Sequence, residues 1–179
     1  MMLHLRPWHP ADAPALVDAV RSSRDLVQQF GTGIEDEEHA RQVITSRMLF
    51  TERTRNWAIT SDGIPVGNVG LSAIERRNDT AWCHYWLALS ARGHGSASRA
   101  LASVADWAFR GDLFRLELGH RVNNPSSCAV ARRAGFIAEG IERKKLKYGT
   151  ERFDVELHSR LRTDPAPRLD LLSFSQASR

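Results

Sequence analysis

The residues best suited to chemistry form a short turn in the middle of the chain. Residues 92–97 read Arg-Gly-His-Gly-Ser-Ala and come between a predicted strand and a predicted helix. A helix start presents N–H groups without intrahelical partners and the positive end of the helix dipole. Glycines let such a backbone approach a phosphate, and an arginine can add a bidentate contact. The turn predicts a pyrophosphate-binding site made of Arg92, Gly93, His94, Gly95, Ser96 and Ala97.

Two other interpretations of this turn stay open. Glycines can serve a tight strand-to-helix turn that binds nothing. A dinucleotide-binding fold also begins with Gly-x-Gly, but Ser98 takes the third glycine position and Glu117 lies inside a strand instead of at its end. The turn also lies too far along the chain for a full fold of that kind. No Gly-Lys-Ser/Thr follows, which excludes a P-loop.

A second polar junction follows the next predicted strand. Residues 123–127 read Asn-Asn-Pro-Ser-Ser, which is typical of a helix start and explains one of the two asparagines as an N-cap. The helix is expected to end at Gly135.

The elements that must position these residues follow from hydrophobic periodicity and turn signals. We expect a mixed α/β fold in the order β-α-α-β-β-β-α-β-α-β-β. The expected strands cover 3–6, 56–60, 64–71, 80–89, 114–122, 136–141 and 152–161, and the expected helices cover 12–22, 35–50, 92–109 and 125–134. Residues 25–34 read as irregular. Residues 163–179 read as a tail that either docks through its apolar side chains or is disordered.

Composition narrows the function classes. The chain has 179 residues, a net charge of +4 and two cysteines, and its isoelectric point is about 9.6. The charge fits a phosphorylated ligand or nucleic acid, but no basic helix or aromatic-basic platform supports a nucleic-acid partner. Neither the cysteines nor the seven histidines show metal-site spacing, so no metal is expected. No apolar segment predicts a membrane span or signal peptide, and we expect a cytoplasmic protein.

Four motifs in order resemble one enzyme family. They are Tyr85-Trp86-Leu87, the turn at 92–97, Asn124-x-x-Ser127 and Ala134-Gly135-Phe136. Together they resemble the GNAT superfamily of N-acetyltransferases, within it the branch that includes ribosomal-protein N-terminal acetyltransferases. The resemblance spans about residues 3 to 161 and implies one domain over 1–162, followed by the tail.

The resemblance implies a strongly bent, mostly antiparallel sheet flanked by helices. Its two central parallel strands, here 80–89 and 114–122, would splay apart around the pantetheine arm of acetyl-CoA. The turn at 92–97 would hold the pyrophosphate, and Ser127 would lie near the thioester sulfur. Further coenzyme contacts would come from the backbone of Trp86, Leu87 and Ala88, from the side chain of Asn124, and from Arg132, which either meets the 3′-phosphate or belongs to a solvated helix face.

Acetyl transfer needs a neutral amine, a stabilised oxyanion and a protonated or tolerated thiolate. A backbone N–H near Leu87 can hold the oxyanion. His84 and Glu117 are the candidate general bases, each also explicable as a structural residue. The glutamates that many relatives carry are replaced here by Trp82 and Leu146. Ser127 can hydrogen-bond the thiolate, because Ala131 stands where other branches have a tyrosine acid.

The sequence therefore predicts direct transfer of an acetyl group from acetyl-CoA to a primary amine. The acceptor is a protein N-terminus or a small molecule such as an antibiotic or polyamine. Residues 28–33, the second helix and the 147–151 turn would bind it. A succinyl-CoA donor and a non-catalytic acyl-CoA-binding sensor or scaffold remain alternatives, as do a monomer and a homodimer.

Overall fold

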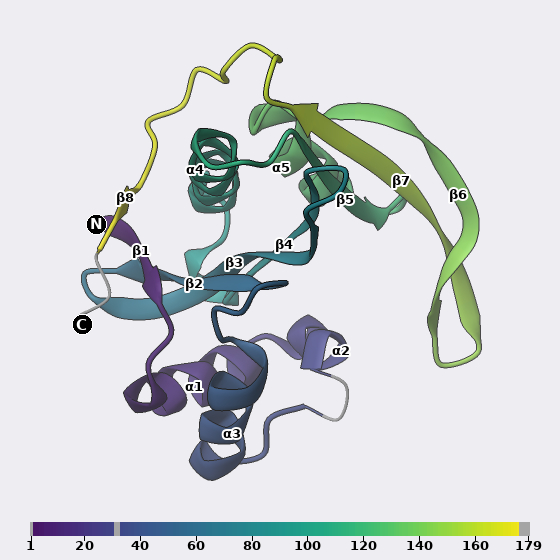
Figure 1. Ribbon diagram of the computed structural model, residues 1–179. Coiled ribbons are helices and arrows are strands. Elements are labelled where there is room, and N and C mark those ends of the chain that lie inside the picture. The colour runs from purple at the N-terminus through teal and green to yellow at the C-terminus, as the bar shows by residue number, and fades with distance from the viewer. Residues whose placement is uncertain (1, 31–32, 176–179) are drawn as a thin grey trace.

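A mixed sheet forms the centre of the computed structural model, which describes residues 2–30 and 33–175 (Figure 1). Its strands are β1 (Leu3–Pro7), β2 (Arg55–Ser61), β3 (Ile64–Glu75), β4 (Thr80–Leu87), β5 (Arg115–Arg121), β6 (Ile137–Tyr148), β7 (Glu151–Leu161) and β8 (Ser173–Phe174). They lie in the order β6-β7-β5-β4-β3-β2-β1-β8. Only the β4–β5 and β1–β8 pairs are parallel among the described strands. The expected fold class is confirmed.

Helices cover both faces of the sheet. They are α1 (Ala13–Ser22), α2 (Val27–Phe30), α3 (Glu37–Arg47), α4 (Ser96–Arg110) and α5 (Pro125–Arg133). In Figure 1, α4 and α5 lie above the sheet, and α1 and α3 lie below it. Each face has its own apolar core, the first centred on α4 and the second on α1 and α3. Within the described ranges, no helix is both long and apolar enough to cross a membrane.

The two central parallel strands separate halfway along their length. Hydrogen-bonded pairing between β4 and β5 covers only Thr80↔Arg115, Ala81↔Leu116 and Trp82↔Glu117. Beyond Trp82, β4 continues to Leu87 and β5 continues to Arg121. Beyond this point the facing edges lose their strand partner. The Leu87 carbonyl accepts from Arg92 and the Arg121 carbonyl accepts from Asn124 N–H, and other backbone groups on these edges are left open to a third partner.

Ala88 N–H donates to the carbonyl of Val66 on β3, at 2.9 Å. Neighbouring residues of a strand point their N–H groups to opposite edges, so Leu87 N–H faces the gap toward β5.

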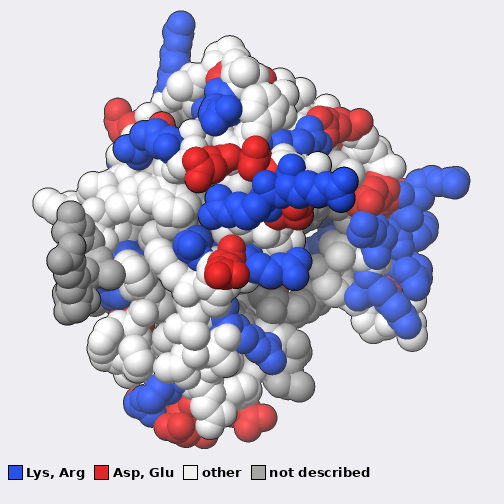
Figure 2. Space-filling model, viewed as in Figure 1, with Lys and Arg blue, Asp and Glu red and all other residues white. Residues whose placement is uncertain are grey.

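Two segments differ clearly from the expectations. Residues 24–30, expected to be irregular, form a 3-10 turn (η2, Arg24–Leu26) followed by α2. The strand expected at 136–141 extends to Tyr148, because residues 146–148 resume the pairing with β7 beyond an irregularity at 143–145. This β6–β7 hairpin carries the concentration of lysine and arginine visible at the right of Figure 2.

The described part of the expected tail packs on the body of the protein. Residues 163–175 pass over α4 and end in β8, which pairs with β1 (Figure 1). Leu172 is 4% exposed, and its N–H donates to Ser103 Oγ on α4 at 2.8 Å. Residues 176–179 lie outside the described residues.

Candidate active site

The turn between β4 and α4 forms an open cradle of backbone amides. Gly93 and Gly95 have φ of +81° and +75°, in the left-handed region that favours glycine, and a Cβ at either would meet only open space. Gly95 is the N-cap of α4 and supplies no side-chain cap, so the first-turn N–H groups keep their capacity to bind an anion. Throughout the described chain, the buried Ser96 hydroxyl finds no hydrogen-bond partner. An anion with oxygen acceptors fits this cradle.

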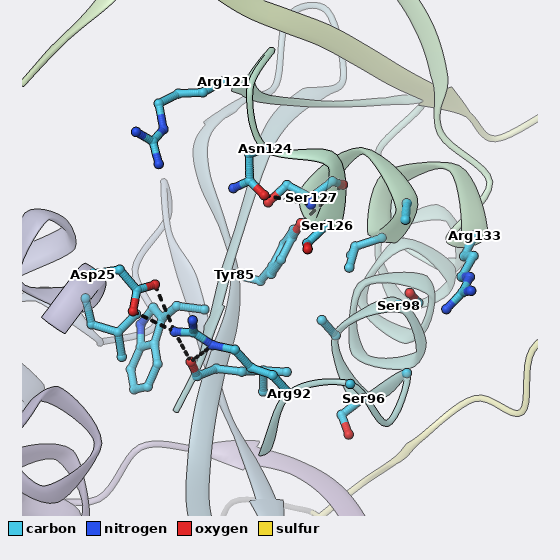
Figure 3. Close-up of a pocket in the computed structure, with 18 of the residues that line it drawn as sticks. Asp25, Tyr85, Arg92, Ser96, Ser98, Arg121, Asn124, Ser126, Ser127 and Arg133 are labelled. Carbon is cyan, nitrogen blue, oxygen red and sulfur yellow. Dashed lines mark hydrogen bonds and ion pairs between the residues drawn. The ribbon is translucent and has the colours of Figure 1, made fainter. Parts of the chain in front are cut away.

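A first pocket of about 550 Å³ runs from this cradle to the gap between β4 and β5 (Figure 3). In Figure 3, the Tyr85 side chain points toward Ser126 and Ser127 at the start of α5. The polar lining residues are Asp25, Tyr85, Arg92, Ser96, Ser98, Arg121, Asn123, Asn124, Ser126, Ser127 and Arg133. Three arginines against one aspartate give this pocket a positive balance, which suits a polyphosphorylated ligand.

Arg92 is held differently from the expectation. Its Nε and one terminal nitrogen donate to the Leu87 carbonyl at 3.0 and 2.9 Å. The same terminal nitrogen reaches both oxygens of Asp25, at 3.1 and 2.9 Å. The guanidinium therefore does not face the cradle as a free bidentate donor. It clamps the end of β4 to the 3-10 turn η2, and its charge still lines the pocket.

The arginine of α5 that faces the first pocket is Arg133, not Arg132. The pocket-lining residues of this helix are Ser126, Ser127, Ala129, Val130 and Arg133. Ser126, Ala129, Val130 and Arg133 follow the i, i+3, i+4, i+7 spacing of one helical face. Arg132 is rotated away from that face and lies near Cys128, so its expected contact with the coenzyme is not supported.

A second pocket of about 270 Å³ adjoins the first at the gap. Its lining includes His84 of β4, His120 of β5, and Leu146 and Tyr148 of β6. Five residues line both pockets, namely Asp25, Tyr85, Arg121, Asn124 and Ser127. Two ligands, one in each pocket, can therefore meet at the gap.

Comparisons with known proteins decide the family. Residues 2–137 match the family model described as an acetyltransferase (GNAT) domain. The chain belongs to the GNAT family of acetyltransferases. The resemblance and the expected acetyl-CoA cosubstrate are confirmed, and this GNAT protein is an acyl-CoA-dependent N-acyltransferase.

Three relatives of this GNAT enzyme are informative. The ribosomal-protein-serine acetyltransferase of Escherichia coli is 32% identical over 131 residues, which cover 72% of this chain and 73% of that one. The probable N-acetyltransferase YjcK of Bacillus subtilis is 31% identical over 155 residues, 81% and 86% of the two chains. The structure of RimL, a ribosomal L7/L12 α-N-protein acetyltransferase in complex with coenzyme A, superposes with a TM-score of 0.81 at 27% identity, covering 90% and 94%.

His84 lies in the second pocket of this GNAT enzyme with a defined tautomer. Trp8 Nε1–H donates to Asn68 Oδ1, Asn68 Nδ2–H donates to Asn56 Oδ1, and Asn56 Nδ2–H donates to the Arg47 carbonyl. Asn56 Oδ1 is therefore an acceptor, and His84 Nε2, 2.9 Å from it, must carry the proton. Burial lowers the pKa of His84. The neutral ring then keeps an unprotonated Nδ1.

Glu117 does not face the cleft. It belongs to the last hydrogen-bonded pair before β4 and β5 separate. It is not one of the described residues that line either pocket. Its Oε1 accepts from Arg115 Nε at 2.6 Å, and its side chain is 39% exposed. The geometry supports a structural hydrogen bond and not the suggested general base.

The other predicted residues fall into two groups. Trp86, Leu87, Gly93, Gly95, Ser96, Ala97, Asn124 and Ser127 line the first pocket. His94 is exposed outside it, and Ala88 is buried in the second core. Asn124 Oδ1 accepts from Ser127 N–H at 3.1 Å, which confirms its N-cap role and leaves its Nδ2 for another partner. The acceptor segment expected at 28–33 includes residues 31–32, which lie outside the described residues.

Sequence reasoning missed three residues at the junction of the pockets, namely Asp25, Tyr85 and Arg121. Tyr85 belongs to a sequence motif that assigns it no role, although its position at the end of a splaying strand is a usable signal. Burial raises the pKa of its phenol, so the hydroxyl remains a proton donor at neutral pH. Asp25 and Arg121 come from a turn and a strand end that carry no motif.

Proposed function

We propose that this protein transfers the acetyl group of acetyl-CoA to the α-amino group of a protein N-terminus by direct transfer in a ternary complex. The observation that carries this proposal is the pair of pockets that meet at the β4–β5 gap through shared residues. The similarity to the E. coli ribosomal-protein-serine acetyltransferase supports a protein acceptor.

The first pocket is the proposed donor site. The 93–97 cradle and Ser96 Oγ would bind the pyrophosphate, and Arg133 would meet the 3′-phosphate. Asn124 Nδ2 and the open backbone edge of β4 would hydrogen-bond the pantetheine amides. The coenzyme supplies an activated thioester at the gap. These roles are supported by an open cradle, a hydroxyl without a partner among the described residues, and strand edges that are unpaired beyond Trp82, which together fit the chemical groups of coenzyme A.

The second pocket is the proposed acceptor site. His84 Nδ1 would accept a proton from the amine, directly or through one water. An α-amino group has a pKa of about 7.7–8.0, whereas a lysine amine has about 10.4. A neutral histidine with a lowered pKa can neutralise the former far more easily, which favours an α-amine acceptor.

The transfer step itself would rely on groups at the gap. Leu87 N–H is aimed at the space between the strands and would stabilise the developing oxyanion. The Tyr85 hydroxyl, 3.5 Å from the Ser127 carbonyl, would protonate the leaving thiolate, with Ser127 Oγ as a further hydrogen-bond donor.

Coenzyme A release with a panel of acceptors tests this function. We expect turnover with a serine-initiated peptide, an N-acetylated product, and none with the same peptide blocked at its α-amine. Spermidine and an aminoglycoside test whether small amines are acceptors. Succinyl-CoA in place of acetyl-CoA tests whether a longer acyl group is transferred. If the folded protein binds acetyl-CoA but none of the tested amines causes release of coenzyme A, the proposal is overturned in favour of an acyl-CoA sensor.

A further inference from the structure

Four metal-ligating side chains converge beside the second pocket. They are His120 of β5, Cys128 of α5, and Glu156 and His158 of β7, and their donor atoms all lie within 4.8 Å of one another. His120 Nε2 lies 3.1 Å from His158 Nε2 and 3.3 Å from Glu156 Oε2. Glu156 Oε2 lies 2.9 Å from His158 Nε2 and 3.4 Å from Cys128 Sγ. Both histidines are buried.

The orientation of His120 turns a lone pair into this cluster. Its Nδ1 is 3.0 Å from the carbonyl of Arg121, which can only accept, so Nδ1 carries the proton. Its Nε2 is then an unprotonated acceptor aimed at His158 and Glu156. In a metal-bound histidine, one ring nitrogen usually donates to a backbone carbonyl or carboxylate while the other nitrogen faces the ion and its other ligand atoms. His120 has this arrangement.

Hydrogen bonding alone leaves this cluster incompletely satisfied. A proton on His158 Nε2 faces two acceptors, His120 Nε2 and Glu156 Oε2, and cannot align well with both. An ion coordinated by His158 Nε2 would replace these two competing contacts with one metal–ligand bond.

We propose that His120, Cys128, Glu156 and His158 bind one divalent transition-metal ion of the zinc class. Zn²⁺ takes nitrogen, sulfur and carboxylate ligands in a tetrahedron with bonds of about 2.0–2.3 Å, which places ligand atoms roughly 3.3–3.8 Å apart. The separations from 2.9 to 3.4 Å given above are close to these values, and the remaining ligand atoms lie within 4.8 Å of one another. On binding, the Cys128 thiol proton passes to solvent and the thiolate coordinates the ion.

The ion would tie β5, α5 and β7 together beneath the junction of the pockets, because His120 lines the second pocket and Cys128 follows Ser127. The four donors come from three elements, so no local spacing motif announces them. The proposal does not involve acetyl transfer, and its test uses neither acetyl-CoA nor an amine.

Titration of Co²⁺ into the metal-stripped full-length protein tests the site. We expect one Co²⁺ per chain, with the visible bands of tetrahedral cobalt, a near-ultraviolet thiolate-to-cobalt band, and displacement by Zn²⁺. The Cys128→Ser and Glu156→Gln variants alter only partly exposed residues. They should bind at least about tenfold more weakly, and Cys128→Ser should also lose the thiolate band. Cys83→Ala removes the other thiol, from outside the cluster, and should keep both the affinity and the band.

Circular dichroism would establish that each variant is folded. Absence of binding by folded wild-type protein would overturn the proposal and leave the cluster as a hydrogen-bonded network. Unchanged affinity and spectrum in Cys128→Ser and Glu156→Gln would also overturn it, because the ion would then be bound elsewhere.

Discussion

The two pockets that meet at the β4–β5 gap are built in different ways. The donor pocket depends on a continuous turn, 92–97, and one face of α5, so most of its groups are backbone amides or neighbours in sequence. The acceptor pocket collects side chains from β4, β5, β6 and the 3-10 turn η2. A site made from local backbone geometry recurs as a motif, whereas a site made from distant side chains can change with the substrate. Variants that affect one pocket and spare the other test this division.

The largest effect is expected in the acceptor pocket, at His84. His84→Gln should lower kcat on the order of 100-fold, because a positioned general base contributes at least that much. The KM for acetyl-CoA should stay unchanged. Initial rates with a serine-initiated peptide measure both constants. Glu117→Gln is the matched control, and an equal loss of kcat there would contradict the assignment.

The pH profile sharpens the same comparison. Burial lowers the pKa of His84 from 6.5, so wild-type kcat/KM, expressed per neutral peptide amine, should fall on the acid side below that value, as the ring gains a proton. His84→Gln should lack this limb. The ring has a higher pKa in the unfolded chain than in the folded chain, so as the pH falls the unfolded chain takes up the proton first. The contribution of the buried neutral ring to the free energy of unfolding is therefore complete above pH 6.5 and declines as the pH falls. An acid limb retained in the variant would assign the limb to another group.

A double substitution in the donor cradle should have the next largest effect. Gly93→Ala combined with Gly95→Ala places two methyl groups in the space proposed for the pyrophosphate. Acetyl-CoA affinity measured by calorimetry should fall at least about tenfold, equivalent to roughly 1.4 kcal/mol.

The control for that variant carries the same backbone strain elsewhere. Gly63 and Gly149 also have positive φ, and a Cβ at either would meet only open space, but they lie in hairpin turns. Gly63→Ala with Gly149→Ala should lose a similar amount of stability, about 1–2 kcal/mol at each position, and keep its acetyl-CoA affinity. Equal affinity losses in both doubles would mean that strain, and not the cradle, is responsible.

A smaller effect is expected for the two adjacent arginines of α5. Arg133→Ala should weaken acetyl-CoA binding about fivefold, since an exposed charge contact contributes about 1 kcal/mol. Arg133→Ala should not weaken the binding of an acetyl-CoA analogue that lacks the 3′-phosphate. Arg132→Ala should change neither. The reverse pattern would restore Arg132 as the coenzyme contact.

The smallest effect is expected for Ser96→Ala, which should raise the stability of the protein and lower its affinity for acetyl-CoA. Ser96→Ala removes a buried hydroxyl without a partner among the described residues, so thermal unfolding should show a gain of about 1 kcal/mol in stability. Acetyl-CoA binding should weaken a few-fold, because the hydroxyl is proposed to meet the pyrophosphate. A gain in stability with unchanged affinity would make Ser96 irrelevant to the coenzyme.

The same division explains what could be predicted from sequence. The 92–97 turn and the Asn124 cap were predictable because each depends on residues close together in the chain. The splayed strands were expected from the family resemblance alone. The clamp of Arg92 on Asp25 was not, because 67 positions separate the two residues. That Arg133 and not Arg132 lines the first pocket could not be predicted, because adjacent residues of one type differ only in helical phase. The extension of β6 to Tyr148 was missed because the pairing of residues 146–148 with β7, and not their composition, makes them a strand.

Initial-rate kinetics test the central claim most directly, with both acetyl-CoA and the serine-initiated peptide varied. If both ligands occupy their own pockets and meet at the gap, the reciprocal plots should intersect, and a dead-end analogue of either substrate should still allow the other to bind. Parallel plots, with an acetylated protein isolated in the absence of acceptor, would contradict direct transfer between the two pockets.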